Sequence, residues 1–287
     1  MPKSLAVAID EFLTKMTPSA SQFSASSRHR AEVEGCINAA IGLNRSVETG
    51  SLRHGTGVSG YSDADYLVSL KGDMPSSPEA ILAKIRDALA SRFWATRIRV
   101  SRPAVVCAFA NGTETVEVTP GYLHGTGEYF SYYIPQPGGT WMLSSPDAHL
   151  AYVNESAARF PSGKVKALIR LLKAWKYLND VQMSSFYLEM RAAQHAMGES
   201  AIVHLIDLCM VFEDLAARAL PDMNDPKRVG GRFSACSSDP RRLEALSKIR
   251  TAATRARRAV DASARGDEVA AFEQLNLLFA GRFPKRW

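Results

Sequence analysis

The sequence ETGSLRHGTGVSGYSDADYLVSL, residues 48–70, places a Gly-Ser pair and a Gly-Thr pair ahead of two aspartates and an apolar run. The run from Ala64 to Leu70 predicts a buried strand. Because side chains two residues apart on a strand point to the same face, Asp63 and Asp65 are expected side by side. Two carboxylates so close repel each other and are costly to bury, so their site must contain something that offsets this cost.

The paired carboxylates form a hard oxygen site of the kind that suits Mg²⁺ or Mn²⁺. A third acid on a neighbouring strand would complete a two-metal site, with ions roughly 3.5–4 Å apart. Glu117, in TVEVTP, is the preferred third acid because its flanking valines otherwise predict a covered sheet. Glu114, nearer the turn, is the alternative. The candidate catalytic and metal-binding residues are therefore Asp63, Asp65 and Glu117.

The glycine pairs upstream of the aspartates predict a loop that can hold phosphate. Gly50 permits a close approach of the backbone, and Ser51 can cap a following turn. Together they offer backbone N–H groups and a hydroxyl to phosphate oxygens. Each fragment is short and common in loops, so the argument depends on the combined spacing.

The combined string GSxxxGTxxxxxSDxD resembles the signature of nucleotidyltransferases of the DNA polymerase β type. It is most similar to the template-independent branch, which includes cyclic GMP-AMP synthase, oligoadenylate synthetase and the bacterial CD-NTases of CBASS antiphage defence. The resemblance implies an α+β fold: a nucleotidyltransferase lobe on a mixed or antiparallel sheet, a C-terminal helical lobe, and an active site in the cleft between them. The expected domains are 1–160, the catalytic lobe with N-terminal spine helices, and 161–287, the helical nucleotide-binding lobe.

Further segments carry the same resemblance. WMLSSPDAH, residues 141–149, is similar to the connector between lobes in CD-NTases, and residues 270–287 are similar to their terminus. LIRLLKAWK followed by SSFYLE resembles the family's lysine-bearing helix and Ser-aromatic pair. By that resemblance Lys173 neutralises the donor's β- and γ-phosphates, Ser185 hydrogen-bonds to the same triphosphate, and Phe186 stacks on a base. Without it, Lys173 would be a solvated helix residue and Phe186 a core residue.

The resemblance implies a metal-dependent nucleotidyltransferase that makes a cyclic di- or trinucleotide second messenger from nucleoside triphosphates. The resemblance also implies that pyrophosphate is released and that the signal serves bacterial antiphage defence. Two Mg²⁺ ions, which Mn²⁺ can replace, are the expected cofactors, and an effector that reads the product is the expected partner. Two alternatives stay open: a template-independent enzyme that tails RNA or modifies a small molecule or protein, and an inactive nucleotide-binding module.

The composition bears on the remaining classes. The 287 residues carry a formal charge of +6, which suits an anionic partner such as a nucleotide. A nucleic-acid interface is not favoured, because the basic run from Arg255 to Arg258 lacks interleaved aromatics.

No apolar run approaches the roughly 20 residues that span a bilayer, and the N-terminal sequence indicates an amphipathic helix. The scattered cysteines indicate neither zinc nor disulfides. We expect a cytoplasmic monomer without membrane contact.

Hydrophobic periodicity predicts the framework around the motif. Strands are expected at Arg45–Thr49, Ala104–Ala110 and Thr113–Thr119, the last two joined by a type I′ turn at Asn111-Gly112. A Gly/Pro-rich passage, residues 132–149, is expected to lead out of the sheet. Helical patterns follow it.

Overall fold

A computed structural model describes residues 2–136, 138–160 and 163–287. These residues form two compact units, each held together mainly by its own contacts. Unit 1 comprises Met1–Thr17, Tyr152–Met223 and Arg232–Trp287, and unit 2 comprises Pro18–Ala151 and Asn224–Gly231.

This division differs from the predicted domains 1–160 and 161–287. The N-terminal helix groups with the C-terminal helices in unit 1, and Asn224–Gly231 groups with the sheet in unit 2. Both groupings join segments far apart in the chain, which a single boundary along the sequence cannot do. The predicted boundary after residue 160 adjoins residues 161–162, which lie outside the described residues.

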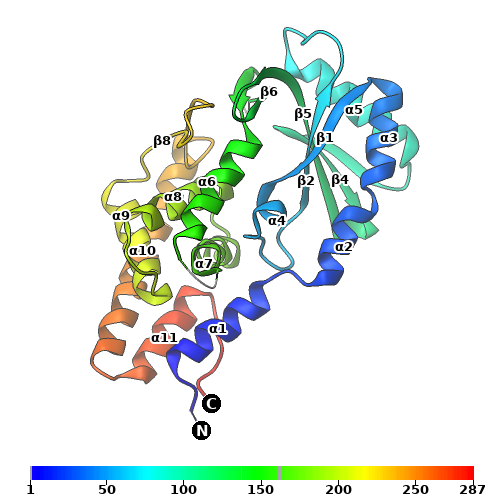
Figure 1. Cartoon of the computed structure of the whole chain (residues 1–287). Helices are drawn as coiled ribbons and strands as arrows, with labels where there is room; N and C mark the ends of the chain where they lie inside the picture. The colour runs from blue at the N-terminus through cyan, green and yellow to red at the C-terminus, as the bar shows by residue number, and fades with distance from the viewer. Residues whose placement is uncertain (1, 137, 161–162) are drawn as a thin grey trace. The chain divides into compact units, whose positions relative to one another are not determined.

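In the described part of unit 2 a mixed seven-stranded sheet forms the framework (Figure 1). Its strands follow the order β1-β2-β5-β4-β3, and β6 pairs with β5 and with β7. The pair β2–β5 is parallel and the other pairs are antiparallel. The strands are β1 (Leu43–Thr49), β2 (Ala64–Leu70), β3 (Arg97–Ser101), β4 (Ala104–Phe109), β5 (Glu114–Thr126), β6 (Phe130–Pro135) and β7 (Trp141–Ser144).

One face of this sheet packs against α3 (Arg30–Ala40) and α5 (Pro78–Arg92), which Figure 1 shows on the same side. Helix α5 begins where the Ser77 side chain accepts a hydrogen bond from the Glu79 N–H, with proline in the first turn. The shared core includes residues of even number from β2 and β5: Ala64, Tyr66, Val68, Leu70, Val116, Val118 and Tyr122. Alternation therefore leaves the odd-numbered residues, both aspartates among them, on the other face. Two further helices precede α3 and β2, namely α2 (Ala20–Arg28) and α4 (Gly50–His54).

The predicted hairpin strands are confirmed, since β4 and β5 pair antiparallel. Asn111 and Gly112 both have positive φ, as the turn chemistry predicts, at 57° and 91°. The turn is longer than two residues, because Ala110 also has positive φ and a short 3₁₀ segment, η1 (Ala110–Gly112), forms. The passage 132–149 does not simply leave the sheet as predicted. Its aromatic residues extend β6 and form β7, with Pro135 at the last position of its strand, where the lost N–H costs little.

Unit 1 is helical and contains α10 (Asp239–Ala264), whose buried side chains are mostly alanines three or four residues apart. Small side chains let neighbouring helices approach closely, and α10 contacts both α9 and α11. The remaining helices are α1 (Leu5–Met16), α7 (Lys164–Leu178), α8 (Ser185–Gly198), α9 (His204–Ala217) and α11 (Glu268–Leu278). The short strands β8 (Met223–Asn224) and β9 (Arg232–Phe233) pair with each other; Met223 and β9 belong to unit 1, and Asn224 belongs to unit 2. Helix α6 (Pro146–Ala158) starts in unit 2 and ends in unit 1.

Helix α1 is the amphipathic N-terminal helix that the sequence predicts. The Ser4 side chain caps it by accepting a hydrogen bond from the Val7 N–H. Its buried face reaches the end of the chain, where the Phe12 ring lies 4.4 Å from that of Phe279, between ring centres. Within the described residues no helix has both the length and the apolar character needed to cross a membrane.

Candidate active site

The three predicted acids lie on one face of the sheet in unit 2. Asp63 immediately precedes β2 and Asp65 is its second residue. The parallel register places Asp65 beside Glu117 of β5. Because Val116 and Val118 point into the core under α3 and α5, Glu117 points to the opposite face, as Asp65 does. The strand pairing thus brings together acids that are 52 positions apart in the chain.

The same register adds a cation that sequence reasoning missed. Glu117 pairs with Val106 of β4, and Val106 pairs with Arg99 of β3. Ile98 and Val100 pack against the core, so Arg99 points to the face of the acids, and its charge favours the ionised forms of Asp63 and Glu117. The signal in the sequence is the alternation RIRV, residues 97–100, whose basic positions share one face of a strand.

Burial and mutual repulsion make this face unfavourable for negative charge. Burial, and then the neighbouring charge of Asp63, raise the pKa of Glu117 to about 7, against the opposing effect of Arg99. Burial also raises the pKa of Asp63, although a hydrogen bond from Thr115 and the charge of Arg99 act in the other direction. Glu117 is therefore not fully ionised at neutral pH, and a bound cation beside these acids would favour their charged forms.

Gly50 lies directly against Asp65. Its φ is +67°, and a Cβ at this position would come within 1.8 Å of Asp65 Oδ2. Thr49, the residue before it, is paired with Asp65 at the end of β1. A larger residue would have to displace the carboxylate or the backbone, so glycine is required here. The predicted phosphate loop is thus adjacent to a predicted metal ligand.

The other residues of the motif hold this loop together. The Ser51 hydroxyl donates to Ser62 Oγ at 3.0 Å, and Ser62 Oγ accepts a hydrogen bond from the Val58 N–H at 2.8 Å. The Thr56 N–H donates to the Ser51 carbonyl oxygen at 2.9 Å. Ser51, Thr56 and Ser62 therefore connect the Gly-Ser turn to the segment that enters β2.

Glu114, the alternative third acid, lies elsewhere. His29 Nε2 is 3.1 Å from Glu114 Oε2, and Arg28 Nη1 is 3.3 Å from Oε1. Glu114 and Glu117 are three positions apart on the same strand, so the two carboxylates point to opposite faces of β5. This arrangement favours Glu117 as the partner of the aspartates.

The donor chemistry of the acid face fits a hard divalent cation, because all three groups are carboxylates on neighbouring strand positions. In the described part of the chain, no three His, Cys, Asp or Glu side chains are grouped closely enough to hold an ion. The residues present thus match the expected ligand type, and the side chains would have to converge further around the metal.

In unit 1 the predicted phosphate-binding lysine is buried. Lys173 of α7 is 0% exposed, and its Nζ lies 3.3 Å from Glu189 Oε2 of α8. It is therefore not the solvated helix residue that its sequence context alone would suggest. The prediction that Lys173 contacts a triphosphate stays a prediction.

Ser185 contacts a second lysine that the sequence analysis did not select. Lys176 Nζ donates to Ser185 Oγ at 2.8 Å, and the Tyr177 hydroxyl lies 3.0 Å from the same oxygen. Burial, and then the charge of Lys173, lower the pKa of Lys176 to about 8. We call Lys176, Tyr177 and Ser185 the lysine–serine group. Lys176 follows Lys173 by three residues, a helical spacing visible in the sequence.

Phe186, predicted to stack on a base, packs against Phe233 of β9 with 4.8 Å between ring centres. The ring is partly buried, and the contact is tilted rather than stacked. Its role in base binding stays a prediction.

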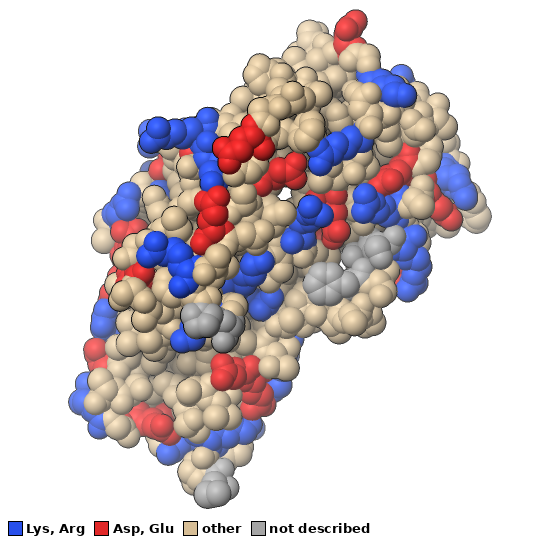
Figure 2. Space-filling view, in the orientation of Figure 1, with Lys and Arg blue, Asp and Glu red and all other residues tan. Residues whose placement is uncertain are grey.

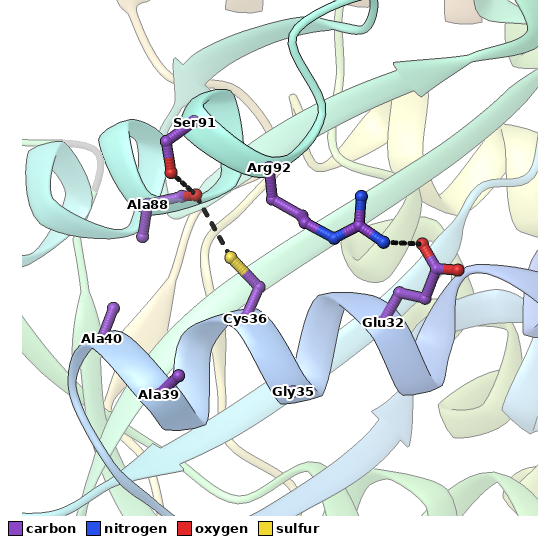
Figure 3. Close-up of a pocket in the computed structure, with 8 residues that line it drawn as sticks. All are labelled: Glu32, Gly35, Cys36, Ala39, Ala40, Ala88, Ser91 and Arg92. Atoms are coloured by element: carbon purple, nitrogen blue, oxygen red, sulfur yellow. Dashed lines mark hydrogen bonds and ion pairs between the residues drawn. The ribbon is translucent and has the colours of Figure 1, made fainter.

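The hollow in Figure 3 is separate from the acid face. It lies between α3 and α5, has a volume of about 660 Å³ and is lined mainly by small side chains. The Cys36 thiol donates to the Ala88 carbonyl oxygen at 3.2 Å, and Arg92 pairs with Glu32 at 3.6 Å. Because α3 and α5 cover the face of the sheet opposite the acids, these residues take no part in the candidate active site.

Charge on the described part of the face drawn in Figure 2 is mixed. Lysine and arginine side chains are interspersed with aspartate and glutamate rather than gathered into one basic area. The net charge of +6 therefore does not correspond to an extended nucleic-acid track on that face.

Comparison with known proteins supports the same assignment. Solved structures with this fold include CdnC of E. coli MS115-1 with ATP, at 17% identity and a TM-score of 0.76 over 97% of this chain and 98% of that chain. The CD-NTase CdnG of Bradyrhizobium diazoefficiens in complex with GTP has 14% identity and a TM-score of 0.72, covering 96% and 98% of the two chains. At these identities the likeness establishes the fold.

The Vibrio cholerae cyclic AMP-GMP synthase DncV, solved with the linear intermediate 5′ pppA(3′,5′)pG, has 14% identity and a TM-score of 0.68. It is matched over 99% of this chain and 82% of its own. None of the curated proteins compared matches the chain.

The family itself is established by sequence. The sequence model of SMODS, the Second Messenger Oligonucleotide or Dinucleotide Synthetase domain, matches residues 4–156, more than half of the chain. The predicted polymerase β-like α+β fold and the predicted relation to CD-NTases are both confirmed. The chain belongs to the SMODS family and is a nucleotidyltransferase of the CD-NTase type, the synthases of second-messenger oligonucleotides.

Proposed function

We propose that this enzyme is a metal-dependent nucleotidyltransferase that joins nucleoside triphosphates into a cyclic di- or trinucleotide and releases pyrophosphate. The observation that carries the proposal is the acid face of unit 2: Asp63, Asp65 and Glu117 share one side of the sheet, with Gly50 against Asp65. Three carboxylates on neighbouring positions have no structural purpose that outweighs their repulsion.

In this proposal Asp63, Asp65 and Glu117 hold the cations. Two Mg²⁺ ions bound there would offset the repulsion, activate the acceptor hydroxyl and stabilise charge on the reacting phosphate. The chain's own contribution is to fix the three carboxylates on adjacent strands, so that little reorganisation is needed during the reaction. Gly50 leaves room for a phosphate close to Asp65, and the Ser51 hydroxyl would turn from Ser62 to donate to its oxygens.

The lysine–serine group is proposed to bind substrate phosphate. Lys176 is a largely buried cation whose nearest described hydrogen-bond partner is the neutral hydroxyl of Ser185, so an anion beside it would be stabilising. Ser185 was predicted to have this role, and Lys176 is added to it. Lys173 keeps its predicted role as a second source of positive charge.

The ligands in the related structures agree with these substrates. CdnC was solved with ATP, CdnG with GTP, and DncV with a linear dinucleotide that carries a triphosphate. From the family we further propose that an effector reads the product in bacterial antiphage signalling, and that the enzyme acts as a cytoplasmic monomer.

The test is a product assay. Purified protein is incubated with each of the four radiolabelled nucleoside triphosphates and their mixture, with Mg²⁺ or Mn²⁺, and the reaction is then treated with phosphatase. We expect a small labelled product that resists phosphatase, because a cyclic oligonucleotide has no terminal phosphate. Mass spectrometry then gives the bases and the ring size.

The control is the loss of an aspartate outside the acid face. Asp63→Asn with Asp65→Asn should abolish the product, whereas Asp73→Asn, an exposed aspartate beyond β2, should not change it. Label transferred to added RNA would instead identify a tailing enzyme. Nucleotide binding without any product under both metals would identify an inactive binding module.

A further inference from the structure

A hollow between α8 and α9 has no part in the proposed function. Its volume is about 310 Å³, at the lower end of the range for small-ligand pockets. All of its lining residues belong to unit 1: Arg191, Gln194, His195, Met210, Val211, Asp214, Leu215 and Arg218. The lining thus combines one apolar wall with several polar side chains.

Arg191 is the distinctive member of this lining. The residue is only 6% exposed, yet its hydrogen bonds go to neutral oxygens: Gln194 Oε1 at 3.0 Å and the carbonyls of Pro221 and Asp222 at 2.6 and 3.1 Å. Its buried Nε has no hydrogen-bond partner in the described structure. Among the described residues no carboxylate lies within 4.0 Å of its guanidinium. A buried charge of this kind normally has a counter-ion.

The surrounding charges do not supply that counter-ion. Asp214 is exposed and lies 3.5 Å from Arg218, a second guanidinium in the lining. His195 is within 2.8 Å of Asp207, and that carboxylate also accepts a hydrogen bond from the Val203 N–H. The hollow therefore contains two arginines, and the one carboxylate in its lining pairs with the exposed one.

We propose that this hollow binds a small oxyanion, a phosphate or carboxylate group carried on an apolar body. The guanidinium of Arg191 would receive the counter-ion that it lacks, and Arg218 would contact the same group from the exposed side. Met210, Val211 and Leu215 would cover the apolar part of the ligand. Arg191 follows Ser185 by six residues, about 9 Å along α8, so this site is separate from the lysine–serine group.

The binding test uses inorganic phosphate and benzoate as probes, titrated against the full chain at constant ionic strength set with NaCl. Calorimetry should give a Kd on the order of 1 mM for the preferred probe, and 20 mM of it should raise Tm by about 3 °C. Preference for phosphate assigns a phosphate ester as the ligand, and preference for benzoate assigns a carboxylate.

The decisive variant is Gln194→Glu, which places a carboxylate where Arg191 now has only an amide oxygen. It should weaken probe binding by more than tenfold and raise the Tm of the probe-free protein. Arg218→Glu should also weaken binding by at least tenfold. Thr251→Glu adds the same charge at an exposed position of α10 and should leave Kd within twofold.

Arg191 itself is not substituted, because it braces two backbone carbonyls and its loss can unfold the segment. The proposal is wrong if neither probe binds more tightly than chloride, or if Gln194→Glu and Thr251→Glu have the same affinity as the unmodified chain. These measurements do not depend on enzymatic activity, so they test the anion site independently of the proposed reaction.

Discussion

The acid face of unit 2 and the lysine–serine group of unit 1 contain ionisable groups of opposite sign, and burial disfavours the charged form in both. Burial raises the pKa of Glu117 to about 7 and lowers that of Lys176 to about 8, so both groups are moved towards their neutral forms. Neither has a full counter-charge among its described neighbours. An added positive charge would stabilise the ionised form of Glu117, and an added negative charge would stabilise the charged form of Lys176.

The two regions differ in how they are built. Strand register places Asp65 beside Glu117 through backbone hydrogen bonds across the sheet, and Asp63 directly precedes β2. Helix packing places the lysines, whose long side chains depend on their neighbours for orientation. Changes at the acid face should therefore act mainly on the reaction rate, and changes at the lysine–serine group mainly on substrate affinity.

The largest effect is expected for Gly50→Ala. The new Cβ would lie 1.8 Å from Asp65 Oδ2, so the carboxylate must move and kcat should fall by more than about 100-fold. Gly60→Ala is the matched control, because Gly60 also has positive φ, +77°, but no atom lies within 4 Å of its Cβ position. Steady-state kinetics on both variants separates crowding of Asp65 from backbone strain. If kcat fell equally in the two variants, the effect of Gly50→Ala could not be assigned to its contact with Asp65.

The second effect compares two glutamates of β5. Glu117→Gln should reduce kcat by about 100-fold or more, because an amide cannot replace an ionised metal ligand. Glu114→Gln should keep kcat and lower Tm, since it weakens contacts with Arg28 and His29. Product formation and thermal unfolding are measured for both. The reverse result would identify Glu114, and not Glu117, as the third metal ligand.

A third, smaller effect is expected for Lys176→Met, which should raise KM for the triphosphate about tenfold and change kcat less. Lys166→Met, on the same helix α7, is the control for loss of one positive charge. Initial rates over a range of substrate concentrations give both constants. If the two variants have the same KM, the lysine–serine group does not bind substrate.

The smallest effect is the pH dependence of stability at Lys176. Below about pH 8 this lysine is charged in both the folded and the unfolded chain, and the folded state bears the full cost of burying it. As pH rises from about 8 towards the ordinary value of 10.5, only the folded state loses the proton, so stability increases. Lys176→Met does not bear the cost of burying this charge. Its Tm should exceed that of the unmodified, nucleotide-free protein by on the order of 3 °C at pH 7.

That difference should narrow by pH 10, and differential scanning calorimetry in EDTA provides the measurement. A constant difference across the pH range would mean that the pKa of Lys176 is not lowered. Together with a higher KM, a gain in stability at neutral pH would indicate a residue retained for binding rather than for folding.

Much of unit 2 could be predicted from local sequence. The bounds of β2, the strand pair β4–β5 and the helix α5 follow from alternation, turn chemistry and capping, which act within a few residues. The strands β6 and β7 were missed because glycine and proline residues interrupt the aromatic-rich segment that forms them. Arg99 was missed because its relevance depends on three successive strand pairings that no local pattern contains.

By itself the sequence determined the family and predicted that Asp63 and Asp65 lie on one face of a strand. Their spacing and the glycine turns before them are local properties of the chain. Only the tertiary structure decided that Glu117 rather than Glu114 faces Asp65, since that depends on the register between β2 and β5. Tertiary packing likewise placed Lys176 beside Ser185 and left Arg191 buried among neutral oxygens. Desolvation and counter-charge are properties of the packed neighbourhood, and residues distant in the sequence form that neighbourhood.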